Sequence, residues 1–249
     1  MCSGKGYLSM LLSEILPPDR VGKCLLIDKA WPMCHSTPHA HHMSWEHIYG
    51  DMNIDVGPRY FNTWPIPLVT CKKNLKQSKE LDYLRQRFSP SSSKDGETQD
   101  VPIVLILAVH LCGTLSIQAV KLFQMIPSAQ MLLLKPCCLP DIWHAKNAPY
   151  FYVGDYCFPT NDVCARGKWT ADKKKNKWEG PPRWHLQSKF DKWCHYLHEA
   201  MAYQSQNSTD ATEDQQSSGR PLISTKYFEV PVQTKGGFQN VFLYAERGH

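Results

Sequence analysis

The sequence has no hydrophobic run long enough to cross a membrane as a helix. Its longest apolar stretch, residues 103–109, is far shorter than the ~18 residues that a spanning helix needs. The N-terminus also lacks the basic and then apolar order of a secretory signal peptide. We therefore expect a soluble intracellular protein, cytoplasmic or nuclear.

There is little excess charge and no visible internal repeat. The formal net charge is +5 over 249 residues, which by itself favours no class of partner. Hydrophobic residues make up 42% of the chain, enough for a sizeable core in one large domain. The ten cysteines are spread along a chain with no secretion signal, so we expect reduced, mostly buried thiols rather than a disulfide scaffold.

A glycine-rich turn at the start of the chain leads directly into an apolar segment. Gly4 and Gly6 precede residues 7–16, which are apolar on nearly every side, and Pro17 and Pro18 follow. Glycine permits both close approach of a ligand to the backbone and positive φ. The pattern predicts a docking site for a nucleotide-type cofactor at the start of a helix, and a flexible N-terminal tail is the alternative.

Short apolar runs alternate with helical patterns along the rest of the chain. Residues 24–27 are typical of a buried strand that ends at Asp28, and residues 101–109 of a central strand covered on both faces. We also expect helices at 75–88, 115–126 and 186–201, strands at 47–50, 131–134, 223–232 and 241–245, and flexible linkers at 89–100 and 204–219. The alternation predicts an α/β fold with a C-terminal antiparallel hairpin. In such a fold a strand precedes the glycine turn. Here the turn begins at Cys2 and only Met1 comes before it. We therefore expect a single, N-terminally truncated domain whose first strand is missing.

Three motifs make the fold prediction more specific. They are Ser-Gly-Lys-Gly-Tyr-Leu-Ser at 3–9, His-Leu-Cys-Gly at 110–113 and Cys-Cys at 137–138. With this layout the chain resembles a class I S-adenosylmethionine-dependent methyltransferase, similar to the domain of the tRNA ribose 2′-O-methyltransferases with a CHHC zinc finger and of uncharacterised relatives. The resemblance covers about residues 2–140 and implies a Rossmann-like methyltransferase sheet with helices on both faces. The zinc-finger part of the tRNA enzymes has no counterpart in this sequence.

The resemblance implies S-adenosylmethionine as the cofactor. It assigns Ser3, Gly4 and Gly6 to the methionine part, Asp28 to the ribose hydroxyls, Asp51 to the adenine amino group, Trp31 or Met33 to the base, and His110 to the region of the transferred methyl. Asp28 also fits an ordinary acid at a strand end. The candidate catalytic residues are His110 and Cys112. His110 is either a general base or a structural histidine in a turn. Cys112, Cys137 and Cys138 are either nucleophiles, metal ligands or buried packing residues, and we favour packing.

Cysteine and histidine are also concentrated at Cys34, His35, His39, His41, His42 and His47. Thiolate and imidazole are the usual zinc ligands. The spacing matches no structural zinc pattern, and a proline-rich loop explains it equally well. We therefore predict no metal.

Positive charge and tryptophan coincide in a segment that lies within a predicted insertion at 141–189. Residues 166–189 hold eight basic and two acidic residues, a local charge of +6, together with three tryptophans. This combination favours single-stranded nucleic acid, although a solvated loop with packed tryptophans is the alternative. The candidate substrate-binding residues are Lys168, Trp169, Trp178 and Arg183.

The leading functional hypothesis is a methyltransferase that acts on RNA, with tRNA processing as the activity nearest to the resemblance. Two alternatives stay open. One is a non-catalytic RNA-binding or scaffold protein with a degenerate methyltransferase fold. The other is a methyltransferase for a protein or a small molecule.

Overall fold

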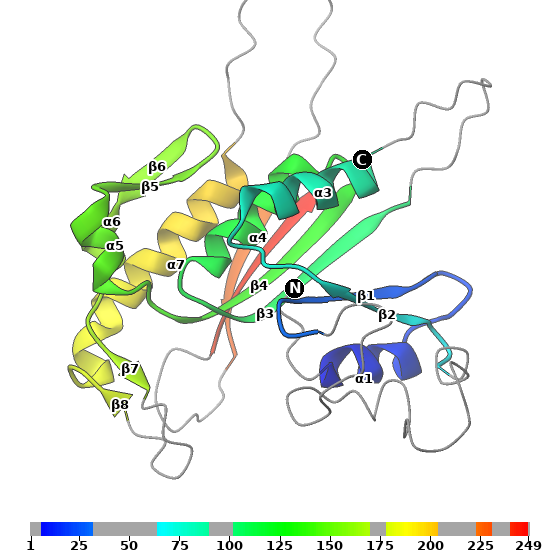
Figure 1. Ribbon diagram of the computed structural model, residues 1–249, viewed down its shortest axis with the longest axis horizontal. Coiled ribbons are helices and arrows are strands. Elements are labelled where there is room, and N and C mark those ends of the chain that lie inside the picture. The colour runs from blue at the N-terminus through cyan, green and yellow to red at the C-terminus, as the bar shows by residue number, and fades with distance from the viewer. Residues whose placement is uncertain are drawn as a thin grey trace, which may run out of the picture. The chain divides into compact units, whose positions relative to one another are not determined.

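The computed structural model describes residues 6–31, 64–89, 102–169, 178–203, 223–230 and 240–248. These residues form a mixed α/β protein with a mixed sheet and helices. The chain divides into two compact units, Met1–Glu80 and Leu81–His249, which are described separately below and can be followed in Figure 1. In the described part of the chain, no helix is both long and apolar enough to cross a membrane.

The first unit contains a helix and two parallel strands. Helix α1 (Tyr7–Ile15) begins directly after Gly6, whose φ of 80° lies in the left-handed region that glycine favours. The helix ends just before Pro17, which has no N–H to continue it. Strand β1 (Cys24–Asp28) then pairs in parallel with β2 (Leu68–Lys72).

A small core holds this unit together. Leu26, Trp31 and Leu68 pack against one another and are almost completely buried. Ser13 provides a polar connection, because its hydroxyl donates to the Ile66 carbonyl at 2.8 Å and accepts from the Ile66 N–H at 3.0 Å. Two hydrogen bonds thus join α1 to the segment that leads into β2.

The second unit is built on a four-stranded sheet. Its strands are β3 (Val104–Cys112), β4 (Ala129–Cys138), β9 (Ile223–Glu229) and β10 (Val241–Arg247), in the order β3-β4-β10-β9. β3 and β4 are parallel, whereas β10 runs antiparallel to both β4 and β9. The parallel part of the sheet therefore ends in an antiparallel hairpin.

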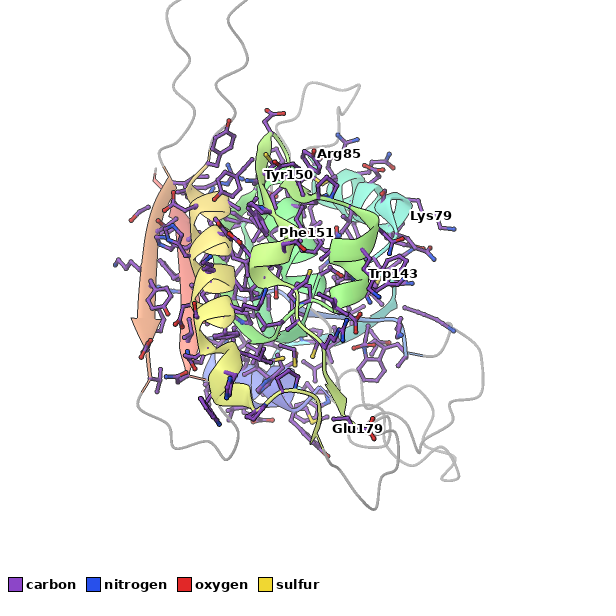
Figure 2. The ribbon with its side chains drawn as sticks, turned by 90° about the vertical axis from the view of Figure 1, so that its left-hand side faces the viewer. Lys79, Arg85, Trp143, Tyr150, Phe151 and Glu179 are labelled. Carbon is purple, nitrogen blue, oxygen red and sulfur yellow. The ribbon has the colours of Figure 1, made fainter. Side chains whose placement is uncertain are left out.

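Two helices cover one face of this sheet. α4 (Leu115–Met125) packs on β3 and β4, α7 (Gln187–Ala202) packs on β9 and β10, and the two helices contact each other. Figures 1 and 2 both show α7 running alongside the last two strands. The residues beneath the helices alternate along the strands as an amphipathic pattern requires; the buried set includes Ile106, Ala108, Leu132, Leu134, Leu243 and Ala245.

An insertion between β4 and α7 packs on the outside of α7. Phe158 is its anchor, with its ring stacked on Tyr196 at a centroid distance of 4.9 Å and tilted against Trp193 at 5.9 Å. The elements of this insertion are α5 (Ile142–Asn147), β5 (Tyr150–Val153), β6 (Tyr156–Pro159), α6 (Thr160–Val163), β7 (Lys168–Trp169), β8 (Trp178–Glu179) and the 3₁₀ helix η2 (Arg183–Leu186). The hairpin β5–β6 gives the insertion an aromatic core of its own.

Most expected elements are confirmed to within a few residues. Helix α3 (Ser78–Phe88) begins three residues later than predicted, and the C-terminal strands form the expected antiparallel pair. The strand predicted at 47–50 and the linkers at 89–100 and 204–219, apart from Ser89, lie outside the described residues.

Three expectations differ from the structure. β3 continues to Cys112, where a turn was expected from His110 onward, because a backbone irregularity is accommodated inside the strand. β3 was expected at the centre of the sheet, but among the described strands it is an end strand next to β4. β2 was not predicted, since its sequence Leu-Val-Thr-Cys-Lys is short and has few strongly apolar residues.

Candidate functional site

The His-Leu-Cys-Gly motif forms the carboxyl end of β3, next to the carboxyl end of the parallel strand β4. Register shifts interrupt the pairing on both sides of Leu111. Here His110 has a φ of 58°, and it is the one described non-glycine residue with positive φ. Holding a non-glycine residue in this left-handed conformation costs about 1–3 kcal/mol of stability, and such strained positions cluster at functional sites. The strand end is therefore the first candidate for a site.

Buried hydrogen bonds fix this irregular strand end to its neighbours. The Ser116 hydroxyl, fully buried in the first turn of α4, donates to the Leu111 carbonyl at 3.1 Å. The Gly113 N–H donates to the Cys138 carbonyl at 3.2 Å, and Gly113 itself has a φ of 54°. The end of β3, the start of α4 and the end of β4 are consequently held as one piece.

His110 has an environment that favours its neutral form. Partial burial lowers the pKa of its imidazole, the positive charge of Lys135 lowers it further, and Cys112 acts in the opposite direction. Lys135 lies on β4, with its Nζ 5.0 Å from the centre of the Phe242 ring, within cation–π range. A neutral imidazole can accept a proton near neutral pH, as a general base must.

Three thiols converge beside this strand end. The sulfurs of Cys112 and Cys137 are 3.3 Å apart, those of Cys137 and Cys138 are 3.7 Å apart, and all three lie within 4.8 Å of one another. Hydrogen bonds with its two neighbours, and then burial, raise the pKa of Cys137, so its thiol is protonated. No disulfide joins the described cysteines, as expected of reduced thiols.

The first unit contains three of the predicted cofactor residues that the structure describes, whereas the fourth, His110, lies on β3 of the second unit. Gly6 starts α1 with the expected positive φ. Asp28 ends β1, and its Oδ1 accepts a hydrogen bond from the Ala30 N–H at 3.0 Å. Trp31 is fully buried in the core of this unit, which favours a packing role over stacking on a base. Sequence motifs predicted the turn and the strand end, whereas the burial of Trp31 depends on its partners Leu26 and Leu68.

Several predicted residues lie outside the described part of the chain. These are Ser3, Gly4, Met33, Asp51 and the cysteine- and histidine-rich set from Cys34 to His47.

The predicted substrate residues lie in the insertion. β7 and β8 pair antiparallel, so that the backbone of Lys168 is opposite Glu179 and that of Trp169 is opposite Trp178. Arg183 begins η2, and the neighbouring Trp184 is 73% exposed. The segment predicted as a nucleic-acid platform thus presents at least one tryptophan to solvent.

Further exposed aromatics elsewhere in the insertion were not predicted. Trp143 on α5 is 61% exposed, and Tyr150 and Tyr152 on β5 are also exposed; Trp143, Tyr150 and Phe151 are labelled in Figure 2. The intervening Phe151 faces the other way, toward Phe158 and Trp193. The sequence Tyr-Phe-Tyr-Val has no polar alternation that could have indicated which side is exposed.

Comparison of the chain with protein-family models, curated proteins and solved structures gives no match.

Proposed function

We propose that this chain is an S-adenosylmethionine-dependent methyltransferase that acts on RNA, built on a Rossmann-like methyltransferase sheet. The observation that carries the proposal is the position of the His-Leu-Cys-Gly motif. The motif ends a parallel strand of a sheet that closes with an antiparallel C-terminal hairpin, as the resemblance expects. Ligands of open α/β sheets bind at the carboxyl ends of the parallel strands.

The residues of the first unit suit a nucleotide-type cofactor. Gly6 leaves room for close approach at the start of α1. The Asp28 carboxylate ends β1, and a carboxylate is able to accept hydrogen bonds from the two hydroxyls of a ribose. We assign Gly6 to the methionine part and Asp28 to the ribose.

The reaction then needs positioning and a proton acceptor. When bound, S-adenosylmethionine supplies a methyl group on a sulfonium that is already strongly electrophilic. The protein contributes mainly by aligning the acceptor atom with the methyl group, because fixed geometry between two reacting groups lowers the barrier to reaction substantially. Within the second unit, the neutral imidazole of His110 is the group able to take a proton from a hydroxyl or amine.

The insertion supplies the features that favour RNA as the substrate. Single-stranded bases stack on exposed aromatic side chains while basic residues contact the phosphates. Trp184, Trp143 and Tyr152 are exposed in the insertion, and residues 166–189 carry a charge of +6. We propose that unpaired bases stack on these side chains.

Calorimetric titration with S-adenosylmethionine tests the cofactor assignment. Asp28→Asn keeps an oxygen for the Ala30 N–H but removes the charge, so affinity should fall by ~1.5–3 kcal/mol, about 10-fold to 150-fold. Asp19→Asn, an exposed acid in the same unit, is the matched control and should bind normally. A folded wild-type chain that binds no S-adenosylmethionine would overturn the proposal.

A second candidate is a non-catalytic RNA-binding protein, favoured by the burial of Trp31 and the local hydrogen bond of Asp28. It predicts RNA binding without cofactor binding. Titration of a single-stranded RNA across salt concentrations should show affinity falling with salt, as phosphate contacts require. Trp184→Ala should weaken this binding by ~1–3 kcal/mol, while Tyr227→Ala on β9 should not. Cofactor binding with salt-insensitive or absent RNA binding would indicate a protein or small-molecule substrate.

A further inference from the structure

The cluster of Cys112, Cys137 and Cys138 has the dimensions of a metal site. A tetrahedral zinc centre with Zn–S bonds of about 2.3 Å places its sulfurs about 3.8 Å apart. The two closest sulfur pairs here are separated by 3.3 and 3.7 Å, and the third pair is within 4.8 Å. Side-chain rotations that open the closest pair by about 0.5 Å and close the widest pair by at most about 1 Å bring all three sulfurs to one ion.

The fold, rather than local sequence, produces this convergence. Cys112 comes from β3 and the other two from β4, and the parallel register pairs Cys112 with Cys138. The left-handed conformation of His110 and the register shift around Leu111 precede the first thiol directly. If the cysteines only filled space, any small apolar side chain would fill it equally well. Packing alone therefore gives no reason for a strained backbone that places three sulfurs together.

The exposure of the three residues is graded. Cys137 is 5% exposed, Cys138 is partly buried and Cys112 is exposed. An ion could therefore reach the cluster from the solvent side, past Cys112. The same side leaves a coordination position open, as in zinc sites that have three protein ligands and a fourth position for water or substrate.

We propose that Cys112, Cys137 and Cys138 bind one Zn²⁺ ion as thiolates, with the fourth position taken by water or by a substrate atom. Binding forms three Zn–S bonds and releases the three thiol protons to solvent. The resulting net negative charge is offset by the positive charge of Lys135, which acts on His110 at the same strand end. This site does not rest on the methyltransferase proposal, since it can be occupied with or without a bound cofactor.

Cobalt titration of the chelator-treated, reduced full chain tests the site. One equivalent of Co²⁺ should give the intense sulfur-to-cobalt charge-transfer absorption of a site with three thiolates, and one equivalent of Zn²⁺ should remove it. Cys112→Ser and Cys137→Ser should each reduce or abolish the absorption. The matched control is Cys157→Ser, since Cys157 is an exposed cysteine on β6 and its loss should change nothing. The cysteine- and histidine-rich set contains one cysteine, Cys34, and cannot by itself imitate the spectrum.

Alkylation followed by mass spectrometry provides a second readout. Zinc should protect Cys112, Cys137 and Cys138 but leave Cys157 reactive. If Cys137→Ser fails to fold, the exposed Cys112→Ser variant still decides the question. Absence of the charge-transfer band in the folded wild-type chain, an equal effect of Cys157→Ser and Cys112→Ser, or no protection by zinc would each overturn the proposal.

Discussion

The double hydrogen bond of Ser13 predicts an effect of one hydroxyl on the whole first unit. Ser13→Ala removes the oxygen that both donates to the Ile66 carbonyl and accepts from the Ile66 N–H. Ser13 is fully buried, so no water replaces it without rearrangement. Each buried backbone group that loses its partner costs about 1–3 kcal/mol, and the better helix propensity of alanine returns about 0.5 kcal/mol. With two such groups, we expect a net loss of about 1.5–5.5 kcal/mol.

Urea denaturation and hydrogen exchange together measure this loss. Exchange of the Ile66 amide should accelerate by roughly 10-fold to 10⁴-fold, because each 1.4 kcal/mol is a factor of ten. Ser9→Ala, a partly buried site on the same helix, is the control and should leave the amide protected. Equal exchange rates of the Ile66 amide in the two variants would refute the reasoning.

The same substitution also tests whether the first unit acts as one body. α1 carries Gly6 at its start, and Ile66 leads into β2, the partner of β1 and hence of Asp28. If Ser13 holds these parts in place, Ser13→Ala should weaken S-adenosylmethionine binding although Ser13 contacts no assigned cofactor residue. Unchanged affinity at a temperature where the variant is still folded would limit the role of Ser13 to stability.

The remaining predictions concern the second unit. Phe158→Ala should cost ~3–5 kcal/mol in urea denaturation, because the ring is 1% exposed and leaves a cavity, whereas Tyr152→Ala, 57% exposed on the same hairpin, should cost less than about 0.5 kcal/mol. Arg247→Lys should destabilise by ~1–3 kcal/mol, because the guanidinium donates from Nε and Nη2 to two separate carbonyls at 2.8 and 2.7 Å and an ammonium does not span both. The hydrogen bond from Tyr196 holds the pKa of Asp162 below its ordinary 3.8, so this interaction stabilises the fold above that pH and is lost as pH falls through the lowered value. Tyr196→Phe should raise the Asp162 pKa in a carboxyl NMR titration, and an unshifted titration would contradict this.

The periodic elements were predictable from the sequence because their burial has a regular signature. In α7, Phe190, Trp193, Leu197 and Met201 recur at three- and four-residue steps, and all four are fully buried in the structure. The apolar run of β3 likewise identified a strand. Its end could not be located, since His110 breaks the alternation in a way that depends on pairing with β4.

The candidate site was only partly predictable for the same reason. The motif at 110–113 identified His110 and Cys112, and the glycine turn identified Gly6. Cys112 and Cys137 are 25 residues apart in sequence, and their distance depends on the register of two paired strands, which no local pattern encodes. The role of Lys135 was missed because its charge affects His110 only across that pair of strands.

The anchoring of the insertion on α7 has a consequence for how this protein can vary. The insertion leaves the sheet after Cys138 and returns at the start of α7, and Phe158 packs against Trp193 and Tyr196 of that helix. Exposed side chains such as Trp143 and Trp184 make little contribution to this packing. Evolution or an engineer can therefore exchange the outward side chains to change what the surface recognises, while the rings beneath must be kept or replaced as a set.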